Sequence, residues 1–343
     1  MKLLSDLDVS GKKVFLRADL DVPVSGEVIE NTDDLPRDVG GEAAIRLKNL
    51  RPTVDFLLSH GAVKVILAGH IDRPDGPDPV LSTKKLKLIL ESILDRSVIF
   101  NPKLENTIEN LELLENLRFF QGEVKNDMEF AKQLAGLADV YVNEAFGNCH
   151  REHASMVLVP QLVSHAAGLH LQKEVEVLSG ILSGPERPLV AVVGGVKIET
   201  KVPLIENLAK TADFVLVGGI LPKEIARQKL KFSDKIIVAE LDDTGKDISE
   251  KSIERFEQVI AGAKTVVWNG PMGFFEQRHE AGTVRVAQAI AESGAFSVVG
   301  GGETTDFLER ASMLEGFSFV SSGGGAMLEF LSGKQLPGLA ALE

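Results

Sequence analysis

The stretch Gly194-Gly195-Val196-Lys197-Ile198-Glu199-Thr200-Lys201 follows directly after the apolar run Leu189 to Val193. An apolar strand, a glycine turn and the start of a helix present backbone N–H groups at one point, and the two lysines add ammonium charges there. This combination is typical of a phosphate site, although such turns also occur for packing alone. The P-loop pattern Gly-x-x-x-x-Gly-Lys-Ser/Thr occurs nowhere in the chain, which excludes that generic nucleotide-binding motif.

Short apolar runs alternate with segments of helical length along the whole chain. This alternation predicts an α/β fold with two doubly wound, Rossmann-like lobes, in which helices cover both faces of parallel sheets. The predicted strands are Val14 to Leu16, Val63 to Ala68, Val140 to Val142, Leu189 to Val193, Phe214 to Val217, Ile236 to Val238, Thr265 to Trp268 and Phe296 to Val299. The predicted helical segments are Thr83 to Leu94, Met128 to Ala138, Ile205 to Thr211, Ser249 to Ala261 and Thr283 to Glu292. Ligands of such sheets bind at the carboxyl ends of the strands.

The domain division follows from one amphipathic segment and from the length. The chain has 343 residues, enough for about two domains of roughly 150 residues each. Ala166 to Leu182 has helical spacing and ends in Ser183-Gly184-Pro185, which predicts a connecting helix followed by a new strand. We therefore expect one lobe over 1–165 with the C-terminal tail 332–343, an interdomain helix over 166–184, and a second lobe over 185–331. The polar stretch Ser25 to Gly41 predicts a loop.

Charge and cysteine content narrow the class of protein. The formal net charge is -13, with 37 Lys+Arg against 50 Asp+Glu, so neither a nucleic-acid surface nor an acidic-membrane surface is expected. The single cysteine cannot form an internal disulfide. No signal-peptide core is present at the N-terminus, and no apolar run reaches the 18 or more residues of a membrane span. The sequence predicts a soluble, cytoplasmic protein.

Two sets of residues carry the candidate chemistry. Basic residues lie at strand ends in the first half, and arginines that converge on one pocket select a small acid with several negative charges, although each alone is more often a solvated surface residue. They are Arg17, Arg46, His70, Arg73, Arg118 and Arg151. The second half carries further glycine turns, and a glycine triplet followed by Glu303 and Thr304 lets backbone approach phosphates while the carboxylate faces Mg²⁺.

The chain resembles the phosphoglycerate kinase family nearly end to end, from Arg17-Ala-Asp-Leu-Asp-Val-Pro23 to Lys334. The resemblance rests on long motifs that occur in family order. They are His70-Ile-Asp-Arg-Pro74, Glu115-Asn-Leu-Arg-Phe119, Asp139-Val-Tyr-Val-Asn-Glu-Ala-Phe-Gly147, Trp268-Asn-Gly-Pro-Met-Gly273 and Gly300-Gly-Gly-Glu-Thr304. It implies a phosphotransferase of glycolysis that uses Mg²⁺ and moves a phosphoryl group between 1,3-bisphosphoglycerate and ADP, giving 3-phosphoglycerate and ATP. It also implies a monomer whose first lobe binds the glycerate and whose second lobe binds the nucleotide.

The resemblance assigns roles to residues by motif. Those implied for the glycerate ligand are Asp19, Asp21, Arg46, His70, Arg73, Arg118 and Arg151. Those implied for the nucleotide are Gly195, Lys201, Gly219, Asn269, Pro271, Glu276 at the ribose, Gly301, Gly302, Glu303 at the metal and Thr304. An acyl phosphate needs no protein nucleophile and no strong base, so catalysis reduces to in-line positioning and charge stabilisation. We assign these to Arg46, Lys197 and Lys201, with N–H groups at Gly302 and Gly325, and expect the two lobes to close through the hinge helix.

The chain departs from the family pattern at three site positions and in two lengths. Asp21, Asp72 and Glu303 stand where Asn, Gly and Asp are usual. The first two add negative charge beside an anion site, and their effect on affinity stays open, although Asp tolerates the left-handed backbone that a glycine position implies. The loop Val24 to Ile45 is longer than usual, which makes Arg37 an alternative to Arg46. Residues 219–247 are shorter than usual, so the base preference cannot be predicted.

Two other functions compete with an active kinase, and one cluster of residues suggests a metal. A non-catalytic phosphoglycerate or nucleotide binder would have kept the fold without turnover. The shared presence of five basic residues argues against it, namely Lys197, Lys201, Arg46, Arg118 and Arg151. A kinase of another small acyl phosphate is a remoter alternative. A zinc site at Cys149, His150 and His153 lacks a fourth ligand, so a buried cysteine beside loop histidines is the better interpretation.

Overall fold

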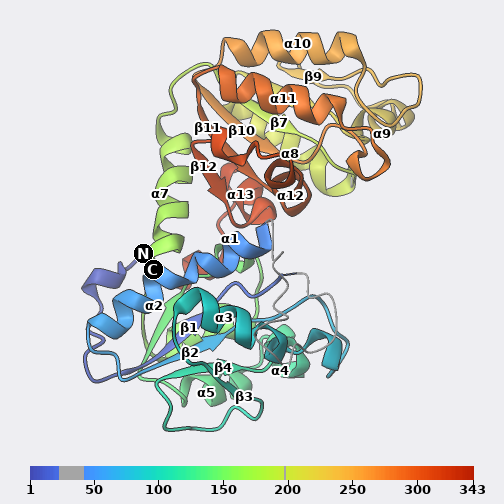
Figure 1. Ribbon diagram of the computed structural model, residues 1–343. Helices are drawn as coiled ribbons and strands as arrows, with labels where there is room; N and C mark the ends of the chain where they lie inside the picture. The colour runs from blue at the N-terminus through green and yellow to red at the C-terminus, as the bar shows by residue number, and fades with distance from the viewer. Residues whose placement is uncertain (23–41, 197) are drawn as a thin grey trace. The chain divides into compact units, whose positions relative to one another are not determined.

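The computed structural model describes residues 1–22, 42–196 and 198–343, and the chain divides into two compact units. The first unit holds Met1–Val175 and Gln335–Glu343, and the second holds Glu176–Lys334. Helix α7 (Leu169–Ser183), drawn in yellow-green in Figure 1, spans the point in the chain where one unit ends and the other begins. This helix begins at Leu169 and not at Ala166, because Ser164–Ala167 pairs with a neighbouring strand.

The first unit is built on a six-stranded parallel sheet in the order β3-β4-β2-β1-β5-β6. Its strands are β1 (Lys13–Arg17), β2 (Lys64–Ala68), β3 (Ile99–Asn101), β4 (Leu111–Leu114), β5 (Val140–Asn143) and β6 (Ser164–Ala167). Arg17 at the end of β1 pairs with Ala68 of β2 and with Asn143 of β5. The loops that follow these three strands therefore leave the sheet at the same edge, where α/β folds bind their ligands.

Helices surround this first sheet (Figure 1). They are α1 (Glu42–Lys48), α2 (Leu50–Ser59), α3 (Lys87–Leu94), α4 (Gln121–Val124), α5 (Met128–Ala135), α6 (Val159–Leu162) and α14 (Pro337–Ala340), with 3-10 turns at Leu4–Asp6, Pro79–Leu81, Thr83–Leu86, Leu117–Phe119 and Phe146–Asn148 and a π-helical turn at Ala154–Leu158. Strand β2 is buried along its whole length, as expected for a parallel strand covered on both faces.

The second unit is built on another six-stranded parallel sheet, in the order β12-β11-β10-β7-β8-β9. Its strands are β7 (Leu189–Val193), β8 (Phe214–Val217), β9 (Ile236–Val238), β10 (Thr265–Asn269), β11 (Phe296–Gly300) and β12 (Phe319–Ser321). The chain proceeds outward from β7 through β8 and β9 on one side and through β10, β11 and β12 on the other. The crevice beside β7 and β10 is thus the topological switch point, where ligands of such sheets bind.

The helices of the second unit are α8 (Ile198–Thr211), α9 (Leu221–Gln228), α10 (Glu250–Ala261), α11 (Ala281–Glu292), α12 (Gly302–Arg310) and α13 (Gly324–Leu331), with 3-10 turns at Phe275–Gln277 and Leu314–Gly316. Helices α10 and α11 pack side by side (Figure 1), and Arg285 of α11 pairs with Glu250 and Glu257 of α10. Within residues 1–22, 42–196 and 198–343, no helix is both long enough and apolar enough to cross a membrane.

The predicted α/β architecture is confirmed, and each of the eight predicted strands is present. The sequence pattern missed β3, β4, β6 and β12. These strands have three or four residues each, and β3 and β6 carry polar or exposed positions, so none forms a continuous apolar run. All four lie toward the outside of their sheets, so the missed strands do not affect the central strands that carry the candidate sites.

Candidate active site

Three loops from the carboxyl ends of β7, β8 and β10 meet in the second unit. The backbone N–H of Gly194 donates to the carbonyl of Asn269 at 2.8 Å, and the N–H of Gly219 donates to the carbonyl of Met272 at 3.1 Å. A Cβ atom on Gly194 would lie 2.1 Å from the carbonyl oxygen of Pro271. No side chain fits in that space, so the close approach of these backbones requires glycine.

Lys201 of α8 is fixed beside these loops. Its ammonium donates to Asn269 Oδ1 at 2.7 Å, and Asn269 Nδ2 in turn donates to the carbonyl of Gly300 at 2.8 Å. Burial lowers the pKa of Lys201 to about 8, against the opposing charge of Glu303. The Lys201 ammonium is therefore held in one position, and burial disfavours its charged form. A bound anionic phosphate would stabilise that charged form.

Two helices begin at the same place. Gly301 precedes α12 with a φ of 106°, and a Cβ there would lie 2.6 Å from Asn269 Nδ2. A Cβ on Gly324, at the start of α13, would lie 2.3 Å from the nitrogen of Gly301, so the two helix starts are in contact. Thr304 Oγ1 accepts from the N–H of Gly270 at 2.9 Å, which joins α12 to the β10 loop. Helix N-termini carry partial positive charge, so their convergence beside Lys201 favours an anion.

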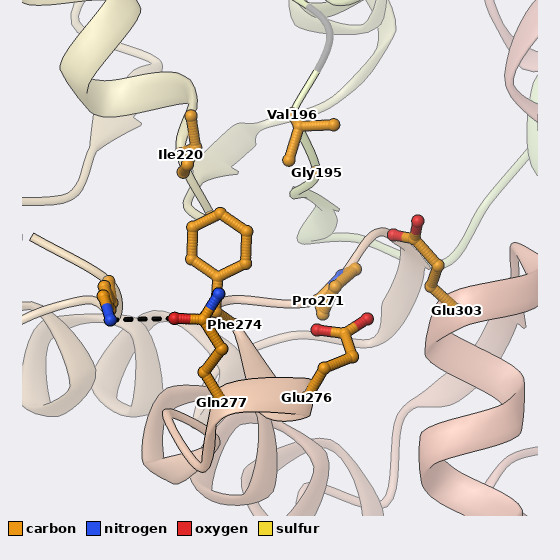
Figure 2. A pocket seen from close by; sticks show the side chains of 11 residues that line it. Gly195, Val196, Ile220, Pro271, Phe274, Glu276, Gln277 and Glu303 are labelled. Atoms are coloured by element: carbon orange, nitrogen blue, oxygen red, sulfur yellow. Dashed lines mark hydrogen bonds between the residues drawn. The ribbon is translucent and has the colours of Figure 1, made fainter.

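A cavity of about 250 Å³ opens next to these turns (Figure 2). It is lined by Gly195, Val196, Gly219, Ile220, Lys246, Pro271, Gly273, Phe274, Glu276, Gln277 and Glu303. Of the residues predicted for a nucleotide, Gly195, Gly219, Pro271, Glu276 and Glu303 line the cavity itself. Lys201, Asn269, Gly301, Gly302 and Thr304 lie in the adjoining turns and helix starts, and Gly325 is exposed in the first turn of α13. Lys197 lies outside the described residues.

The sequence did not single out the remaining cavity wall. No motif that specifies a ligand includes Ile220, Lys246, Phe274 or Gln277. Lys246 lies within residues 219–247, the short segment for which the sequence predicted no base preference. Phe274 and Gln277 lie within two residues of Glu276, which was predicted to contact the ribose. Their closeness to Glu276 in the sequence could have identified them as cavity residues. Lys246 could be found only from the fold, because its place depends on a backbone bond from the N–H of Phe274 to its carbonyl, 2.9 Å long.

The first unit gathers basic side chains around Arg17, which is fully buried. Arg17 Nε donates to Ser155 Oγ at 2.8 Å, Nη1 donates to the carbonyl of Ala18 at 2.7 Å, and Nη2 lies 2.9 Å from His70 Nδ1. Ser155 Oγ donates to Glu123, whose carboxylate is also buried. Burial raises the pKa of Glu123, while the Arg17 charge and the Ser155 hydrogen bonds oppose that rise. The sequence missed Ser155 and Glu123 because they lie far from Arg17 in the chain.

The candidate glycerate residues surround this network. Arg46 Nη1 donates to the carbonyl of Asp21 at 2.5 Å and lies 3.8 Å from Asp19 Oδ1. Arg118 Nη1 donates to the carbonyl of Asp72. Burial lowers the pKa of Arg118 to about 10; the charge of Asp21 opposes this effect, and the charges of Arg17, Arg151 and Arg73 add to it.

The histidines of this cluster are held neutral. Burial, followed by the charges of Arg17 and Arg118, lowers the pKa of His70 well below its usual value. The same causes lower the pKa of His153 to about 3. The structure therefore brings His70, Arg118 and Arg151 into one electrostatic environment with the exposed Arg73, and Arg46 joins it through Asp21, whose pKa both Arg46 and Arg118 lower. Their mutual repulsion favours a ligand with several negative charges. Arg37, the alternative to Arg46, lies outside the described residues.

The two unusual aspartates are accommodated in different ways. Asp21 Oδ1 accepts from the N–H of Asp72 at 2.8 Å, and Oδ2 lies 3.8 Å from His70 Nε2. Burial raises the pKa of Asp21, while the hydrogen bond from the N–H of Asp72 and the charges of Arg46 and Arg118 oppose that rise. Asp72 has a φ of 51°, which agrees with the expectation that this residue adopts a left-handed turn. Its side chain is exposed and accepts from the N–H of Arg73 at 2.8 Å.

The possible metal ligands are sparse. Among the residues that the structure describes, no group of three or more His, Cys, Asp and Glu side chains is arranged to hold a metal ion. Cys149 is buried, and burial raises the pKa of its thiol to about 12. Glu303 is an exposed carboxylate at the cavity and at the start of α12. A single carboxylate suits Mg²⁺ that is held mainly by nucleotide phosphates and water.

Comparisons with known proteins point to one family. A family model described as phosphoglycerate kinase matches residues 4–229 and 222–334. A curated phosphoglycerate kinase from Solibacter usitatus is 39% identical and covers 99% of this chain and 98% of the relative. One from Dictyoglomus turgidum is 37% identical over the same shares. Among solved structures, phosphoglycerate kinase from Coxiella burnetii has a TM-score of 0.79 at 31% identity, covering 99% of this chain and 98% of that chain. The Pyrococcus horikoshii enzyme has a TM-score of 0.84 at 28% identity, with 100% and 98% covered.

Proposed function

The chain belongs to the phosphoglycerate kinase family, and we propose that it transfers a phosphoryl group reversibly between 1,3-bisphosphoglycerate and ADP, giving 3-phosphoglycerate and ATP. The observation that carries this proposal is that each unit gathers its own anion site at the carboxyl ends of its strands. One site is a cluster of arginines, and the other is a cavity bordered by glycine turns, a half-buried lysine and two helix starts. The comparisons do not favour the alternative of a non-catalytic binder.

In this proposal the second unit binds the nucleotide. Lys201 contacts a nucleotide phosphate, and the N–H groups of Gly302 and Gly325 at the starts of α12 and α13 contact phosphoryl oxygens. The contact between the two helix starts supports this assignment, because it places two positive helix ends beside the Lys201–Asn269 bond. Glu276 contacts the ribose from its place on the cavity wall. Lys197 is assigned to the transferring group from its sequence position.

The first unit binds the glycerate ligand in this proposal. Arg46, Arg73, Arg118 and Arg151 supply positive charge to the phosphate and the carboxylate, while neutral His70 donates or accepts a hydrogen bond. Asp19 is buried and accepts from Asn148 Nδ2 at 3.2 Å, so it orients the loop after β1 and is within 3.8 Å of Arg46. Asp21 and Asp72 limit the net positive charge of the pocket. The arginine forks suit bidentate binding of carboxylate and phosphate oxygens.

The chemistry requires positioning more than proton transfer. The acceptor of the phosphoryl group is a carboxylate in one direction and an ADP phosphate in the other, so neither needs activation by a base. The residues therefore align the two oxygens with the phosphorus and stabilise charge on the transferring group, which is the task of Arg46 and Lys201. Because the two ligands bind to different units, transfer requires closure that brings them together and excludes water, with α7 as part of the hinge.

Magnesium fits this site through Glu303. The carboxylate lines the cavity at the first turn of α12, where nucleotide phosphates would also lie. When bound, Mg²⁺ supplies positive charge to those phosphates. Glu303 has one methylene more than the usual aspartate, which lets it hold the ion directly or through water. We include in the proposal that the protein is monomeric and acts in the cytoplasm.

A coupled assay tests this function directly. ATP-dependent phosphorylation of 3-phosphoglycerate is measured with Mg²⁺ and repeated with GTP, next to the variant Lys201→Met. Lys251→Met serves as the matched control, because Lys251 is exposed and pairs with Glu240 away from the cavity lining. We expect turnover in the unmodified protein and in the control, and a large loss in Lys201→Met. Nucleotide binding without turnover for any nucleotide would contradict the proposed activity.

A further inference from the structure

A groove in the second unit lies beside β9, apart from the nucleotide cavity. Its volume is about 630 Å³, and its lining comes from α9, from residues 229–231 and from residues 238–241. The linings of the groove and of the nucleotide cavity share no described residue. The groove is therefore a separate surface, and no step of the proposed phosphoryl transfer uses it.

Strand β9, which borders the groove, is the edge of its sheet. It pairs in parallel with β8, and the carbonyl of Lys235 and the N–H of Ala239 each form a bond of 2.9 Å to that strand. Because alternate residues of a parallel strand bond to opposite sides, Ile236 and Val238 direct their backbone groups outward. The N–H of Ile236 donates to the carbonyl of Ser233 at 2.9 Å. No described residue bonds to the carbonyl of Ile236 or to either backbone group of Val238, so these groups are open to another chain.

The strand lacks two devices that commonly keep edge strands from pairing. Its residues, Ile236, Ile237 and Val238, include no charged side chain and no proline. Lys235 lies directly before the strand, but its ammonium donates to the carbonyl of Ala212 at 3.2 Å, so its charge is engaged within the fold. The outer edge of β9 therefore carries no charge of its own that would oppose a further strand.

Positive charge gathers in the groove from the neighbouring helix and loop. Three exposed lysines line it. They are Lys223, Lys229 and Lys231. Among the described residues none of these lysines forms an ion pair, because Glu224 pairs with Arg227 and Glu240 pairs with Lys251. The whole chain has a formal net charge of -13, so the groove is a local basic surface on an acidic protein. Its charge complements a segment that carries carboxylates.

Apolar side chains lie between these lysines. Ile225 of α9 is buried, and Leu230, Val238 and Leu241 are half-buried in the same lining. The side chains of an extended segment alternate between two faces, so such a segment can direct one set toward apolar walls and the other toward solvent-exposed charges. The groove thus offers the three features that strand addition uses, namely open backbone groups, apolar pockets and complementary charge.

We propose that the groove between α9 and β9 binds an extended acidic segment of another protein, which adds to β9 as a further strand. Backbone bonds to Ile236 and Val238 hold the segment, and its carboxylates pair with the lysines of the groove. The inference goes beyond the proposed kinase activity and does not depend on it, because the groove lies outside the nucleotide cavity.

Peptide binding tests the inference with a defined probe. Fluorescence anisotropy measures the binding of a short blocked peptide in which glutamate alternates with valine, and of a matched peptide with lysine at each glutamate position. We expect saturable binding of the acidic peptide and no binding of the basic one. The double variant Lys223→Glu with Lys231→Glu should weaken binding of the acidic peptide about tenfold. The matched control is Lys210→Glu with Lys264→Glu, which changes the net charge equally at exposed lysines outside the groove and should leave binding unchanged.

Val238→Pro separates strand addition from charge attraction. Proline removes the outward N–H of Val238, and edge strands tolerate proline where that N–H has no partner in the fold. Val238→Ala is the control, because it loses the branched side chain and keeps the N–H. We expect the acidic peptide to bind about fivefold more weakly to the proline variant than to the alanine variant, with kinase turnover unchanged in both. The lysine variants test the inference independently if Val238→Pro does not fold.

Each outcome supports the inference or overturns it. Equal binding of the two peptides, no binding of either peptide, or unchanged binding in the double lysine variant overturns it. Binding that needs the lysines but not the N–H of Val238 indicates a simple anion site and overturns strand addition. Sedimentation that finds a dimer, converted to a monomer by Val238→Pro, would identify a second copy of this chain as the occupant and contradict the proposed partner. Peptide binding without any kinase turnover would contradict the proposed function and leave this inference supported.

Discussion

The two candidate sites attract anions by different means. The first unit concentrates side-chain charge, and burial, to which the neighbouring arginine charges add, lowers the pKa of Arg118 to about 10 and the pKa of His70 well below its usual value. The second unit relies mainly on its backbone, with glycine turns that admit no Cβ, two helix starts and one half-buried lysine. A cluster of like charges gains stability when a multiply charged ligand neutralises it, whereas a backbone cradle selects by shape. We therefore expect substitutions that remove charge to weaken ligand binding at the first site. At the second site, we expect substitutions that change the shape of the backbone cradle to weaken it.

The largest effect is expected from Arg46→Ala. Arg46 Nη1 lies 3.8 Å from Asp19 Oδ1 and donates to the carbonyl of Asp21, and the proposal assigns Arg46 to the charge of the transferring group. Its removal should reduce turnover on the order of 10³-fold, as for other arginines that stabilise phosphoryl transfer. Turnover is measured in the coupled assay, with Arg51→Ala as the control, because Arg51 is exposed and pairs with Asp55 on α2. A variant that retains turnover within about threefold would remove Arg46 from the mechanism.

Lys201 gives the corresponding test of the second site through pH. Burial lowers the pKa of Lys201 to about 8, so the side chain is cationic below that pH and becomes a neutral amine above it. A phosphate needs the cation, so affinity for ADP should be highest below about pH 8 and fall by up to about tenfold per pH unit above it. Calorimetry from about pH 7 to about pH 9.5 measures this slope. Lys201→Met should bind more weakly at neutral pH and lose the slope; a variant with the same slope would assign the titration to another group.

The sequence predicted the site residues that follow strands. It did not predict the residues that only tertiary contacts bring to the sites. Gly195, Asn269 and Gly301 each lie within two residues of the end of an apolar run, so a local sequence pattern predicts all three at one edge of the sheet. Ser155 and Lys246 could not be placed in this way. Ser155 is 138 residues from Arg17, and Lys246 is 31 residues from Gln277. Their roles depend on tertiary contacts that no periodicity encodes.

Ser155→Ala tests whether the hydrogen bonds of Ser155 to Arg17 and Glu123 stabilise the charged cluster of the first site. Ser155 Oγ accepts from Arg17 Nε and donates to Glu123, so the substitution leaves a buried donor and a buried carboxylate short of one partner each. We expect the free energy of unfolding to fall by about 1–3 kcal/mol, and the KM for 3-phosphoglycerate to rise more than the KM for ATP. Urea denaturation and steady-state kinetics measure the two effects. Ser59→Ala, which removes an exposed hydroxyl bonded to the carbonyl of Phe56, should change neither. Equal increases of both KM values would show that the network does not act on the first site in particular.

The smallest effect is expected at Asp72, where charge and backbone can be separated. Its N–H donates to Asp21 and its carbonyl accepts from Arg118, and both bonds survive any change of side chain. Asp72→Asn removes a negative charge beside the arginines and keeps tolerance for the φ of 51°, so it should lower the KM for 3-phosphoglycerate about two- to threefold without changing stability. Asp72→Gly should lower the KM equally and also raise the free energy of unfolding by up to about 1 kcal/mol, because glycine adopts this backbone without strain. If only the glycine variant lowered the KM, the turn and not the charge would limit glycerate binding, and the first site would then depend on shape as the second does.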